Sequence, residues 1–517
     1  MVTTPEIKIK AGTIVGKYIE DNVVAYLGIP YAKPPVGELR LMPPVDHPEW
    51  DDVKDCTEFG SSPYQAAIGP DPIWTEEFKA TNTNVSEDCL TINVFANPNK
   101  KNMPVVLYHY GGGFTSGGSS CEIYDGTELA KRGVVLVTFN HRVGTLALFT
   151  SKEDESSASN ESNIIGNHLL LDDLQALKWV RENIAFLGGD SENITIMGQS
   201  SGASEVNMLT ASALTKGKIK RSISLGFNSY NLFSRPLLTK EFGRSISEDV
   251  LKQLNVSEDE LKNVDAKSIL DAGNIGNLIT DGYIIKKQFK DAVNEGDTNQ
   301  VPFVMSAVPG DCLMGGIFSR YMLDGGKVDS KDILKQLCSN FFQEKEEEAE
   351  RIYDFDNREI DDIKRDINND FLVAAMLEFA IGRKEASCEQ PTYILFFTHV
   401  MPGPMADKFG AFHSCEVPYF FNHLSDYRKE YWKEEDYSLG ERMVSELAAF
   451  VSTGEFASEE FVPSDGTNYT LIQADGIQNV TFPKEKLDIY LYALSRVHGE
   501  FVRNGNIIGF REDAYKK

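Results

Sequence analysis

The sequence lacks any apolar stretch long enough to cross a lipid bilayer, and it lacks the features of a secretory signal. No window approaches the roughly 20 consecutive apolar residues that a membrane-spanning helix needs. The first residues, MVTTPEIKIKAGTIVG, contain neither an apolar core nor a small-residue cleavage site, and they are typical of a first strand. Because the chain begins with Met1, we expect a protein that is made and kept in the cytoplasm, with no membrane partner.

Positive charge is also scarce, with 51 Lys and Arg against 78 Asp and Glu, which gives a net charge of −27. A nucleic acid or an anionic membrane would repel such a chain, so neither is an expected partner. Cysteine is too sparse for a disulfide framework, since the 7 cysteines are scattered, odd in number and without metal-ligand spacing. We therefore expect mainly free thiols, no metal and no cofactor.

Apolar content, in contrast, is sufficient for a large folded core, because 41% of the 517 residues are hydrophobic. The pattern predicts buried strands at 104–110, 134–142, 194–197, 301–308 and 392–400, and helices at 171–187 and 203–209. A solvated helix face is expected at 343–350, and an exposed loop at 151–163. Strands that alternate with helices in this way indicate an α/β protein with a mostly parallel sheet.

The segment ITIMGQSSGAS, residues 194–204, contains a serine in the frame G-x-S-x-G. Gly198 and Gly202 give this frame to Ser200 alone, since Ser201 lacks glycines at the matching positions. A strand that turns sharply into a helix at such a frame is a nucleophile elbow, which raises the serine hydroxyl above the end of the sheet. The motif by itself also fits a glycine-rich turn, so other parts of the chain have to decide.

A nucleophilic serine needs a base, a group that orients the base, and hydrogen-bond donors for the oxyanion. The donors are expected in YGGGF, residues 110–114, directly after a predicted strand. His109 and His141 lie in buried runs and are interpreted as satisfied core residues, whereas His413 lies in a loop-like stretch late in the chain. Hydrolases of this sheet type bring nucleophile, acid and histidine in that order, so Asp311, which follows a predicted strand, is the expected acid.

Several longer motifs occur along the chain in a fixed order. They are YLGIPYAKPPVGELRLMPP (26–44), EDCLTINVF (87–95), YGGGF, VVLVTFNHRVG (134–144), ALKWVRENIAFLGGD (176–190), the elbow and GAFHSCEVPYFF (410–421). With these motifs the chain resembles the type-B carboxylesterases, which include bacterial p-nitrobenzyl esterases, animal carboxylesterases and cholinesterases. The resemblance implies an α/β-hydrolase fold, with a mostly parallel central sheet flanked by helices and large helical insertions, in a single domain over residues 1–517.

The resemblance also implies roles for individual residues. The catalytic residues would be Ser200 as nucleophile, His413 as base and Asp311 as acid. The oxyanion hole would consist of the backbone N–H groups of Gly112, Gly113 and Ser201.

The chain departs from the family pattern at the elbow and at the acid. Gln199 and Ser201 replace the usual glutamate and alanine, so Gln199 is expected to contact substrate without adding a charge and to favour neutral esters. Asp311 replaces a glutamate, and its carboxylate falls short by roughly 1.5 Å unless the loop shifts. We expect the Pro309–Gly310 pair before it to allow that shift, because the backbone of glycine can take angles that are closed to other residues.

Two assignments have rival interpretations. Asp311 would only cap a turn if Glu416, three residues after the histidine, held the imidazole instead. The early disulfide of the family lacks its usual second cysteine here, so Cys89 is expected to be a thiol or to pair with the off-pattern Cys56.

The sequence thus predicts a serine carboxylesterase that hydrolyses small neutral esters through an acyl-enzyme. An acyltransferase or a lipase would use the same triad. A catalytically inactive ligand-binding or adhesion protein of this fold is the alternative from another class, and it would be expected to have lost a serine, histidine or oxyanion glycine. The sequence retains all three.

Overall fold

Two units make up the computed structural model of the chain, which describes residues 2–66, 69, 71, 73–152, 166–226, 237–312, 317–318, 322, 326–496, 501–504 and 507–510. The first unit consists of Met1–Ile223, Leu237–Lys287 and Val417–Ala457, and the second of Ser224–Pro236, Gln288–Glu416 and Ser458–Lys517. The boundary falls inside strand β12 (Arg221–Leu225). Most of the loop expected at 151–163 lies outside the described residues.

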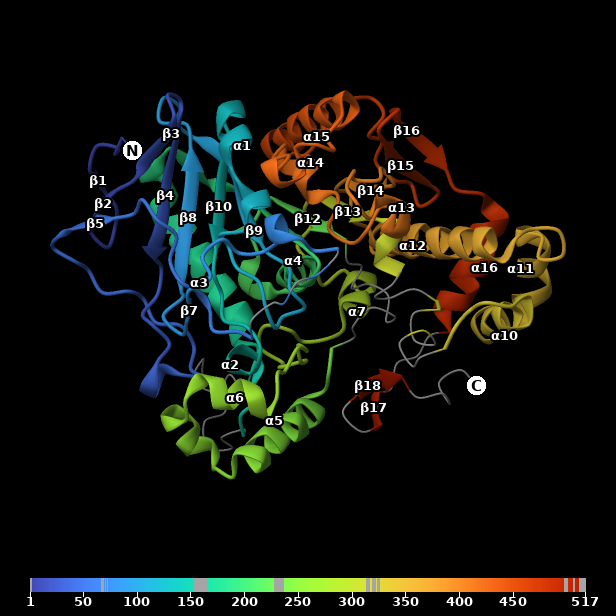
Figure 1. Cartoon of the computed structure of the whole chain (residues 1–517), viewed down its shortest axis with the longest axis horizontal. Helices are drawn as coiled ribbons and strands as arrows, with labels where there is room; N and C mark the ends of the chain where they lie inside the picture. Colours follow the sequence, from blue (N-terminus) through green and yellow to red (C-terminus); the bar gives the residue numbers. More distant parts are fainter. Residues whose placement is uncertain are drawn as a thin grey trace. The chain divides into compact units, whose positions relative to one another are not determined.

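The first unit contains six neighbouring strands in the order β11-β9-β10-β8-β4-β3. They are β3 (Lys17–Glu20), β4 (Val23–Pro30), β8 (Thr91–Ala96), β9 (Met103–His109), β10 (Val135–Phe139) and β11 (Gly189–Gln199). Figure 1 shows β9, β10, β8 and β4 side by side. β9, β10 and β11 are mutually parallel, and β8, β4 and β3 continue the sheet antiparallel. Val105 on β9 pairs with Val135 on one side and Ile194 on the other. The three predicted strands of this unit are therefore confirmed as its parallel centre.

The N-terminal segment forms two short strands, which corrects the single first strand expected there. β1 (Ile7–Lys8) and β2 (Thr13–Val15) pair antiparallel, and β5 (Val53–Asp55) adds to β2 in parallel. The amide of Ile9 donates to the carbonyl of Gly12 across the turn between them. A small pair, β6 (Ser62–Pro63) and β7 (Val85–Ser86), follows.

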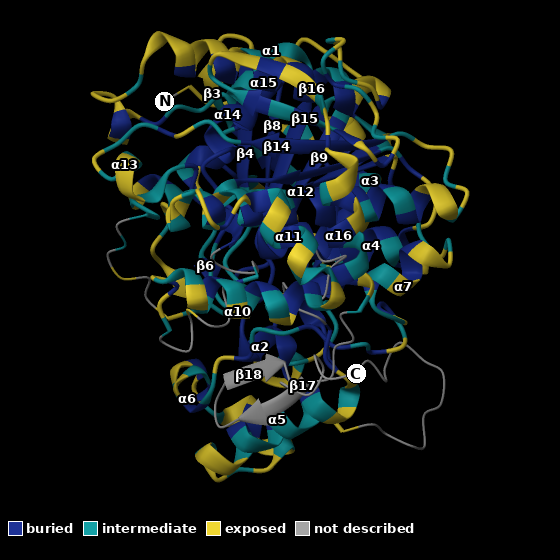
Figure 2. Ribbon diagram, turned by 90° about the vertical axis from the view of Figure 1, so that its right-hand side faces the viewer, coloured by how far each residue is buried: buried dark blue, intermediate teal, exposed yellow. Residues whose placement is uncertain are grey.

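The helices of the first unit are α1 (Thr127–Arg132), α2 (Thr145–Leu148), α3 (His168–Asn183), α4 (Ser201–Ala211), α5 (Lys240–Leu254), α6 (Ala266–Ala272), α14 (Val417–Phe421) and α15 (Glu434–Thr453). Of these, α1, α3, α4 and α15 pack against the strands, whereas α6 packs against α2 and α5. α3 begins three residues before the predicted helix, and a 3-10 turn, Ile184–Leu187, completes the predicted range. Figure 2 shows the central strands such as β9 as buried, whereas α5 is drawn mainly in the colours of partly buried and exposed residues.

The second unit contains strands in the order β16-β15-β14-β13. They are β13 (Phe303–Ala307), β14 (Thr392–Phe397), β15 (Asn468–Gln473) and β16 (Gly476–Thr481). The first three are parallel, and β16 returns antiparallel. All residues of β13 and β14 are buried, as predicted for strands covered on both faces.

Helices of the second unit include the long α12, which packs against β13, β14 and β15. They are α7 (Phe289–Asn294), α10 (Lys331–Phe342), α11 (Glu346–Tyr353), α12 (Ile360–Glu385), α13 (Ala406–Phe409) and α16 (Lys484–Ser495), and the hairpin β17 (Phe501–Asn504) and β18 (Ile507–Phe510) follows. The acidic stretch at 343–350 forms a 3-10 turn and the start of α11, in which Ala349 is buried and the charged side chains reach solvent.

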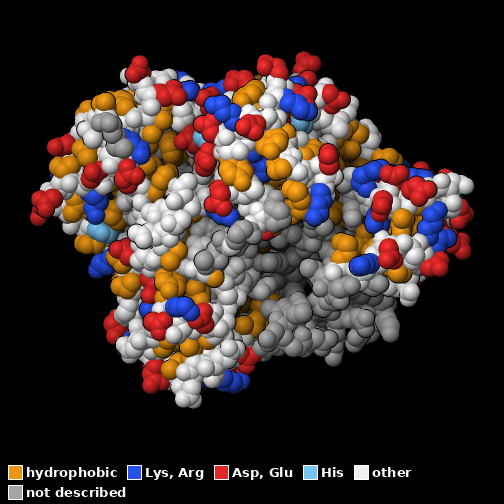
Figure 3. Space-filling model, in the orientation of Figure 1, with side chains coloured by type: hydrophobic (Ala, Val, Ile, Leu, Met, Phe, Trp, Pro, Cys, Tyr) orange, Lys and Arg blue, Asp and Glu red, His pale blue; other side chains and the backbone are white. Residues whose placement is uncertain are grey.

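Charged side chains of both signs lie interspersed on the face drawn in Figure 3. Among the helices in the described ranges, none has both the length and the apolar character that crossing a membrane requires.

Candidate active site

Ser200 stands between the end of β11 and the start of α4, in a backbone conformation that a serine rarely adopts. Its φ is +58° and its ψ is −123°, and the residue is buried, at 8% exposure. A Cβ on Gly198 would lie 2.2 Å from the carbonyl oxygen of Gly202, and a Cβ on Gly202 would lie 2.1 Å from that of His109. Both glycines are therefore required sterically, and the strand–turn–helix context of an elbow is present.

The glycine loop after β9 lies directly against this serine. A Cβ on Gly111 would be only 2.8 Å from the Cβ of Ser200 and 2.7 Å from Oε1 of Gln199. Gly112 and Gly113 have φ values of +139° and +64°, which side chains disfavour. The first backbone N–H groups of α4 have no acceptor within the helix, and they form its positive end. The first unit thus brings Ser200 together with the loop and the helix start that the sequence predicted as sources of oxyanion donors.

Asp311 and His413 form a buried hydrogen-bonded pair in the second unit. Nδ1 of His413 lies 2.5 Å from Oδ1 of Asp311, and the amide of Val308 donates to Oδ2 at 2.9 Å. Asp311 ends a 3-10 turn, Pro309–Asp311, directly after β13. His413 and Asp311 are 6% and 8% exposed. Both carboxylate oxygens are thus held, and one of them fixes the imidazole ring.

Gly310 explains how the short aspartate reaches the histidine. Its amide donates to the carbonyl of Ala411 at 2.8 Å, and a Cβ on it would lie 2.5 Å from the backbone nitrogen of His413 and 2.6 Å from Cα of Phe412. Its φ is outside the left-handed region. The expectation that the backbone freedom of Gly310 lets Asp311 reach His413 is therefore wrong. Instead, the absence of a side chain on Gly310 lets the two loops approach each other.

Glu416 lies close to this pair without a hydrogen bond from another residue. It is fully buried, and burial, followed by the charge of Asp311, raises the pKa of Glu416 to about 8, although His413 acts in the opposite direction. Burial lowers the pKa of His413, but the charge and hydrogen bond of Asp311, with a smaller contribution from Glu416, raise it more. Of the two carboxylates considered from the sequence, Asp311 is the one that contacts the ring.

The two histidines interpreted as satisfied core residues are buried, but neither is fully satisfied. Neither ring nitrogen of His109 makes a hydrogen bond, and the carboxylates of Asp173 and Glu205 lie beside it. Nδ1 of His141 contacts the carbonyl oxygen of Arg142 at 2.9 Å, whereas its Nε2 makes no hydrogen bond. No sequence pattern indicates this cluster, because its members lie far apart in the chain and on different elements.

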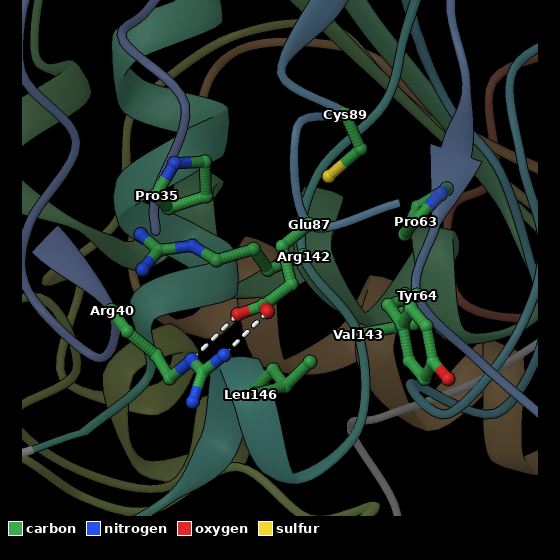
Figure 4. A pocket seen from close by; sticks show the side chains of 9 residues that line it. All are labelled: Pro35, Arg40, Pro63, Tyr64, Glu87, Cys89, Arg142, Val143 and Leu146. Atoms are coloured by element: carbon green, nitrogen blue, oxygen red, sulfur yellow. Dashed lines mark hydrogen bonds and ion pairs between the residues drawn. The ribbon is translucent and has the colours of Figure 1, made fainter. Parts of the chain in front are cut away.

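Two ion pairs of the first unit, one partly buried and one buried, involve motif residues that do not belong to the site. Arg40 binds Glu87 in a two-pronged pair, with Nε–Oε1 at 2.7 Å and Nη2–Oε2 at 2.5 Å, beside a small pocket (Figure 4). Arg142 binds Asp172 in the same manner, with Nε–Oδ2 at 2.8 Å and Nη2–Oδ1 at 2.7 Å. Ser200 is not among the residues that line this pocket. These motifs therefore stabilise the fold around the site.

All seven cysteines lie in the described part of the chain and are free thiols there. Six are buried, and Cys388 is partly exposed. Burial raises the pKa of Cys56 to about 12, which lowers its reactivity as a thiolate.

The chain belongs to the carboxylesterase family, because residues 3–479 match the model that describes the "Carboxylesterase family". It is 32% identical over 319 residues to fumonisin B1 esterase of Sphingopyxis macrogoltabida, which covers 57% of this chain and 54% of that protein. It is 38% identical over 279 residues to para-nitrobenzyl esterase of Bacillus subtilis (strain 168), which covers 53% and 52%. The chain thus spans about half the length of these curated relatives.

A solved structure titled PNB esterase matches with a TM-score of 0.76 and 26% sequence identity, over 94% of this chain and 99% of that one. A thermophilic PNB esterase matches with a TM-score of 0.73 and 25% identity, again over 94% and 99%. The predicted α/β-hydrolase fold and the family resemblance are both confirmed.

Proposed function

We propose that this chain is a serine carboxylesterase that hydrolyses neutral carboxylic esters through an acyl-enzyme. The observation that carries the proposal is the strained backbone of Ser200 beside the glycine loop. A non-glycine residue at such angles costs on the order of 1–3 kcal/mol and persists where function requires it. Membership of the carboxylesterase family and the Asp311–His413 pair support the same chemistry.

In the proposed mechanism His413 is the general base. Its Nδ1–H donates to Asp311, so Nε2 keeps a lone pair that takes the proton from Oγ of Ser200. The resulting alkoxide attacks the ester carbonyl carbon, and the imidazolium then gives its proton to the departing alcohol. A water molecule, activated by the same nitrogen, releases the acid and restores the serine.

Negative charge develops on the carbonyl oxygen in each of these two steps. We propose that the backbone N–H groups of Gly112, Gly113 and Ser201 stabilise it, because the glycine loop and the start of α4 both adjoin Ser200. One such donor is worth about 10²–10³-fold in kcat in hydrolases that have been dissected by mutation.

Gln199 is proposed to contact the substrate beside the nucleophile. It carries no charge, so it offers a cationic alcohol group no attraction, and neutral small-molecule esters are the expected substrates. A single catalytic domain over residues 1–517 and a cytoplasmic location without nucleic-acid or membrane partners stay predictions. The first is supported by a family match that runs through both units.

Active-site labelling with a fluorophosphonate tests the proposal. The wild-type chain should bind one equivalent at Ser200 and hydrolyse p-nitrophenyl acetate, whereas Ser200→Ala should do neither. Ser201→Ala is the matched control, because it removes a neighbouring hydroxyl and keeps the backbone N–H. Near-normal hydrolysis by a folded Ser200→Ala variant would refute the assignment. Adding alcohols of increasing length, with analysis of the products, separates hydrolysis from acyl transfer.

A further inference from the structure

A second group of chemically active side chains lies behind the elbow, in the core of the first unit. His109 ends β9, Asp173 lies on α3 and Glu205 lies on α4, and all three are completely buried. One ligand atom from each residue lies within 4.8 Å of the other two. The proposed ester hydrolysis uses none of these side chains.

The distances in this cluster exceed those of hydrogen bonds. Nδ1 of His109 lies 3.3 Å from Oε2 of Glu205 and 3.5 Å from Oδ2 of Asp173, and none of these atoms makes a hydrogen bond. Ordinary N–H···O bonds measure about 2.7–3.2 Å. Two ligands of one tetrahedral zinc ion lie about 3.3–3.4 Å apart, as follows from metal–ligand bonds of about 2.0–2.1 Å. The two separations from Nδ1 of His109 therefore fit shared ligation better than direct bonding.

The charge of the cluster points in the same direction. Within the described ranges, no Lys or Arg forms an ion pair with Asp173 or Glu205, although the adjacent Asp172 is fully paired with Arg142. Two carboxylates buried without a cation cost several kcal/mol each. A divalent cation bound by a neutral histidine and two carboxylates makes the group electrically neutral.

His141 adds an independent indication of a cation. Its Nδ1 faces the carbonyl oxygen of Arg142 at 2.9 Å, and because a carbonyl can only accept, Nδ1 carries the hydrogen. In the neutral ring, Nε2 then presents a lone pair, and this atom lies 3.6 Å from Oε2 of Glu205 without a hydrogen bond. The lone pair on Nε2 and the negative oxygen of Glu205 repel each other, and a positive ion bound between them would remove this repulsion.

We propose that His109, Asp173 and Glu205 bind one divalent transition-metal ion, for which Zn²⁺ is best suited, and that His141 completes or supports the site. Imidazole nitrogen together with carboxylate oxygen is a ligand set that zinc accepts. This proposal departs from the sequence-based expectation of no metal, which considered only spacing along the chain.

The ion would have a structural role. The cluster joins the strand that leads into the glycine loop to the helix that starts after Ser200, and Gly202 of that helix already packs on the carbonyl oxygen of His109. Because all three ligands are buried, the ion would not contact substrate. It would instead fix the distance between nucleophile and oxyanion donors.

The alternative to a metal ion in this cluster is a proton on His109. Burial lowers the pKa of His109, but the neighbouring carboxylates of Asp173 and Glu205 outweigh it and raise the pKa to about 9. An imidazolium between the two carboxylates would leave no room for a metal, so the experiment has to distinguish metal from proton.

The test is the metal content of the full-length chain, made without a histidine tag in zinc-supplemented medium. Mass spectrometry of the desalted protein should find about one zinc per chain, and a chelator should remove it and lower Tm, which added Zn²⁺ restores. Glu205→Gln and Asp173→Asn should each bind less than about a tenth of that amount.

His168→Asn is the matched control. His168 is equally buried on α3, and its ring nitrogens also make no hydrogen bond. Within the described ranges it forms no ion pair with a carboxylate, and burial followed by the charge of Arg142 lowers its pKa to about 3. This variant should keep its zinc. Wild-type protein without stoichiometric transition metal, and with a Tm that neither chelator nor Zn²⁺ changes, would overturn the proposal in favour of the proton, whatever the variants do. Zinc retained in full by folded Glu205→Gln would also overturn it.

Discussion

Replacing Gly310 by alanine should damage catalysis without any change to a catalytic side chain. The glycine lies in the turn that carries Asp311, and its backbone packs against the loop that carries His413. An added Cβ would meet backbone atoms, at 2.5 Å from the nitrogen of His413 and 2.6 Å from Cα of Phe412. Backbone atoms cannot rotate away as a flexible side chain can, so the two loops have to separate.

The size of the effect follows from these distances. Ordinary contact begins near 3.4 Å, so the loops must move apart by about 0.9 Å, the difference between 3.4 and 2.5 Å. If the whole shift acts along the bond, the distance from Asp311 to His413 grows from 2.5 Å to about 3.4 Å, beyond hydrogen-bond range. A misplacement of about 1 Å costs about 10²-fold, and complete loss of the orienting acid costs about 10⁴-fold. We therefore expect kcat to decrease by a factor between about 10² and about 10⁴.

The assay is the steady-state hydrolysis of p-nitrophenyl acetate, with circular dichroism and thermal unfolding to show that the variant folds. Gly476→Ala is the control in the same unit, because a Cβ at that position meets nothing within 4 Å. It should leave both kcat and Tm unchanged. A folded Gly310→Ala variant with kcat within twofold of wild type would refute the reasoning that this glycine sets the contact between acid and histidine.

Asp311→Asn should lower kcat on the order of 10⁴-fold, because it leaves His413 in the wrong tautomer. Glu416→Gln should lower kcat clearly less, because Glu416 makes no hydrogen bond to the ring. If Glu416→Gln lowered kcat more than Asp311→Asn, the role of the acid would move to Glu416. The acid limb of kcat/KM should have its midpoint above about pH 6.5. His413 is a base only when neutral, and although burial lowers its pKa, Asp311 raises it further, so protonation persists to higher pH; a pH–rate profile with a lower midpoint contradicts this. Finally, Gln199 should give a higher kcat/KM for a neutral thioester than for butyrylthiocholine, and a clear preference for the choline ester would refute its role as a neutral contact.

The parallel centre of the first unit could be predicted because its strands are continuous apolar runs. The ends of these strands could not. Residues 134–142 were expected to be extended throughout, but β10 ends at Phe139, and the amide of Arg142 donates to the side chain of Asp172 at 3.0 Å. The amide of Arg142 thus donates to a side chain of a helix that is distant in sequence, and not to a neighbouring strand. No local sequence pattern predicts such a hydrogen-bond partner.

The candidate site divides along the same line. Ser200 could be located from sequence because the elbow imposes a local steric rule, which requires glycines two residues before and after it. The contact between Asp311 and His413 depends on Gly310 as a place of close approach, which composition cannot distinguish from a flexible turn. The cluster of His109 with Asp173 and Glu205 forms only when three elements pack together. The spacing of these residues along the sequence therefore does not predict it.

The free thiols also allow the local unfolding of the chain to be measured. Cys56, Cys89 and Cys121 belong to the first unit, and Cys312, Cys338, Cys388 and Cys415 belong to the second. An alkylating reagent should modify the partly exposed Cys388 at once and reach each buried thiol only when the surrounding structure opens, so that its rate measures a local opening free energy. Equal rates for the buried thiols of both units would mean that 1–517 unfolds as one cooperative domain. Two distinct groups of rates would mean that each unit loses its structure separately.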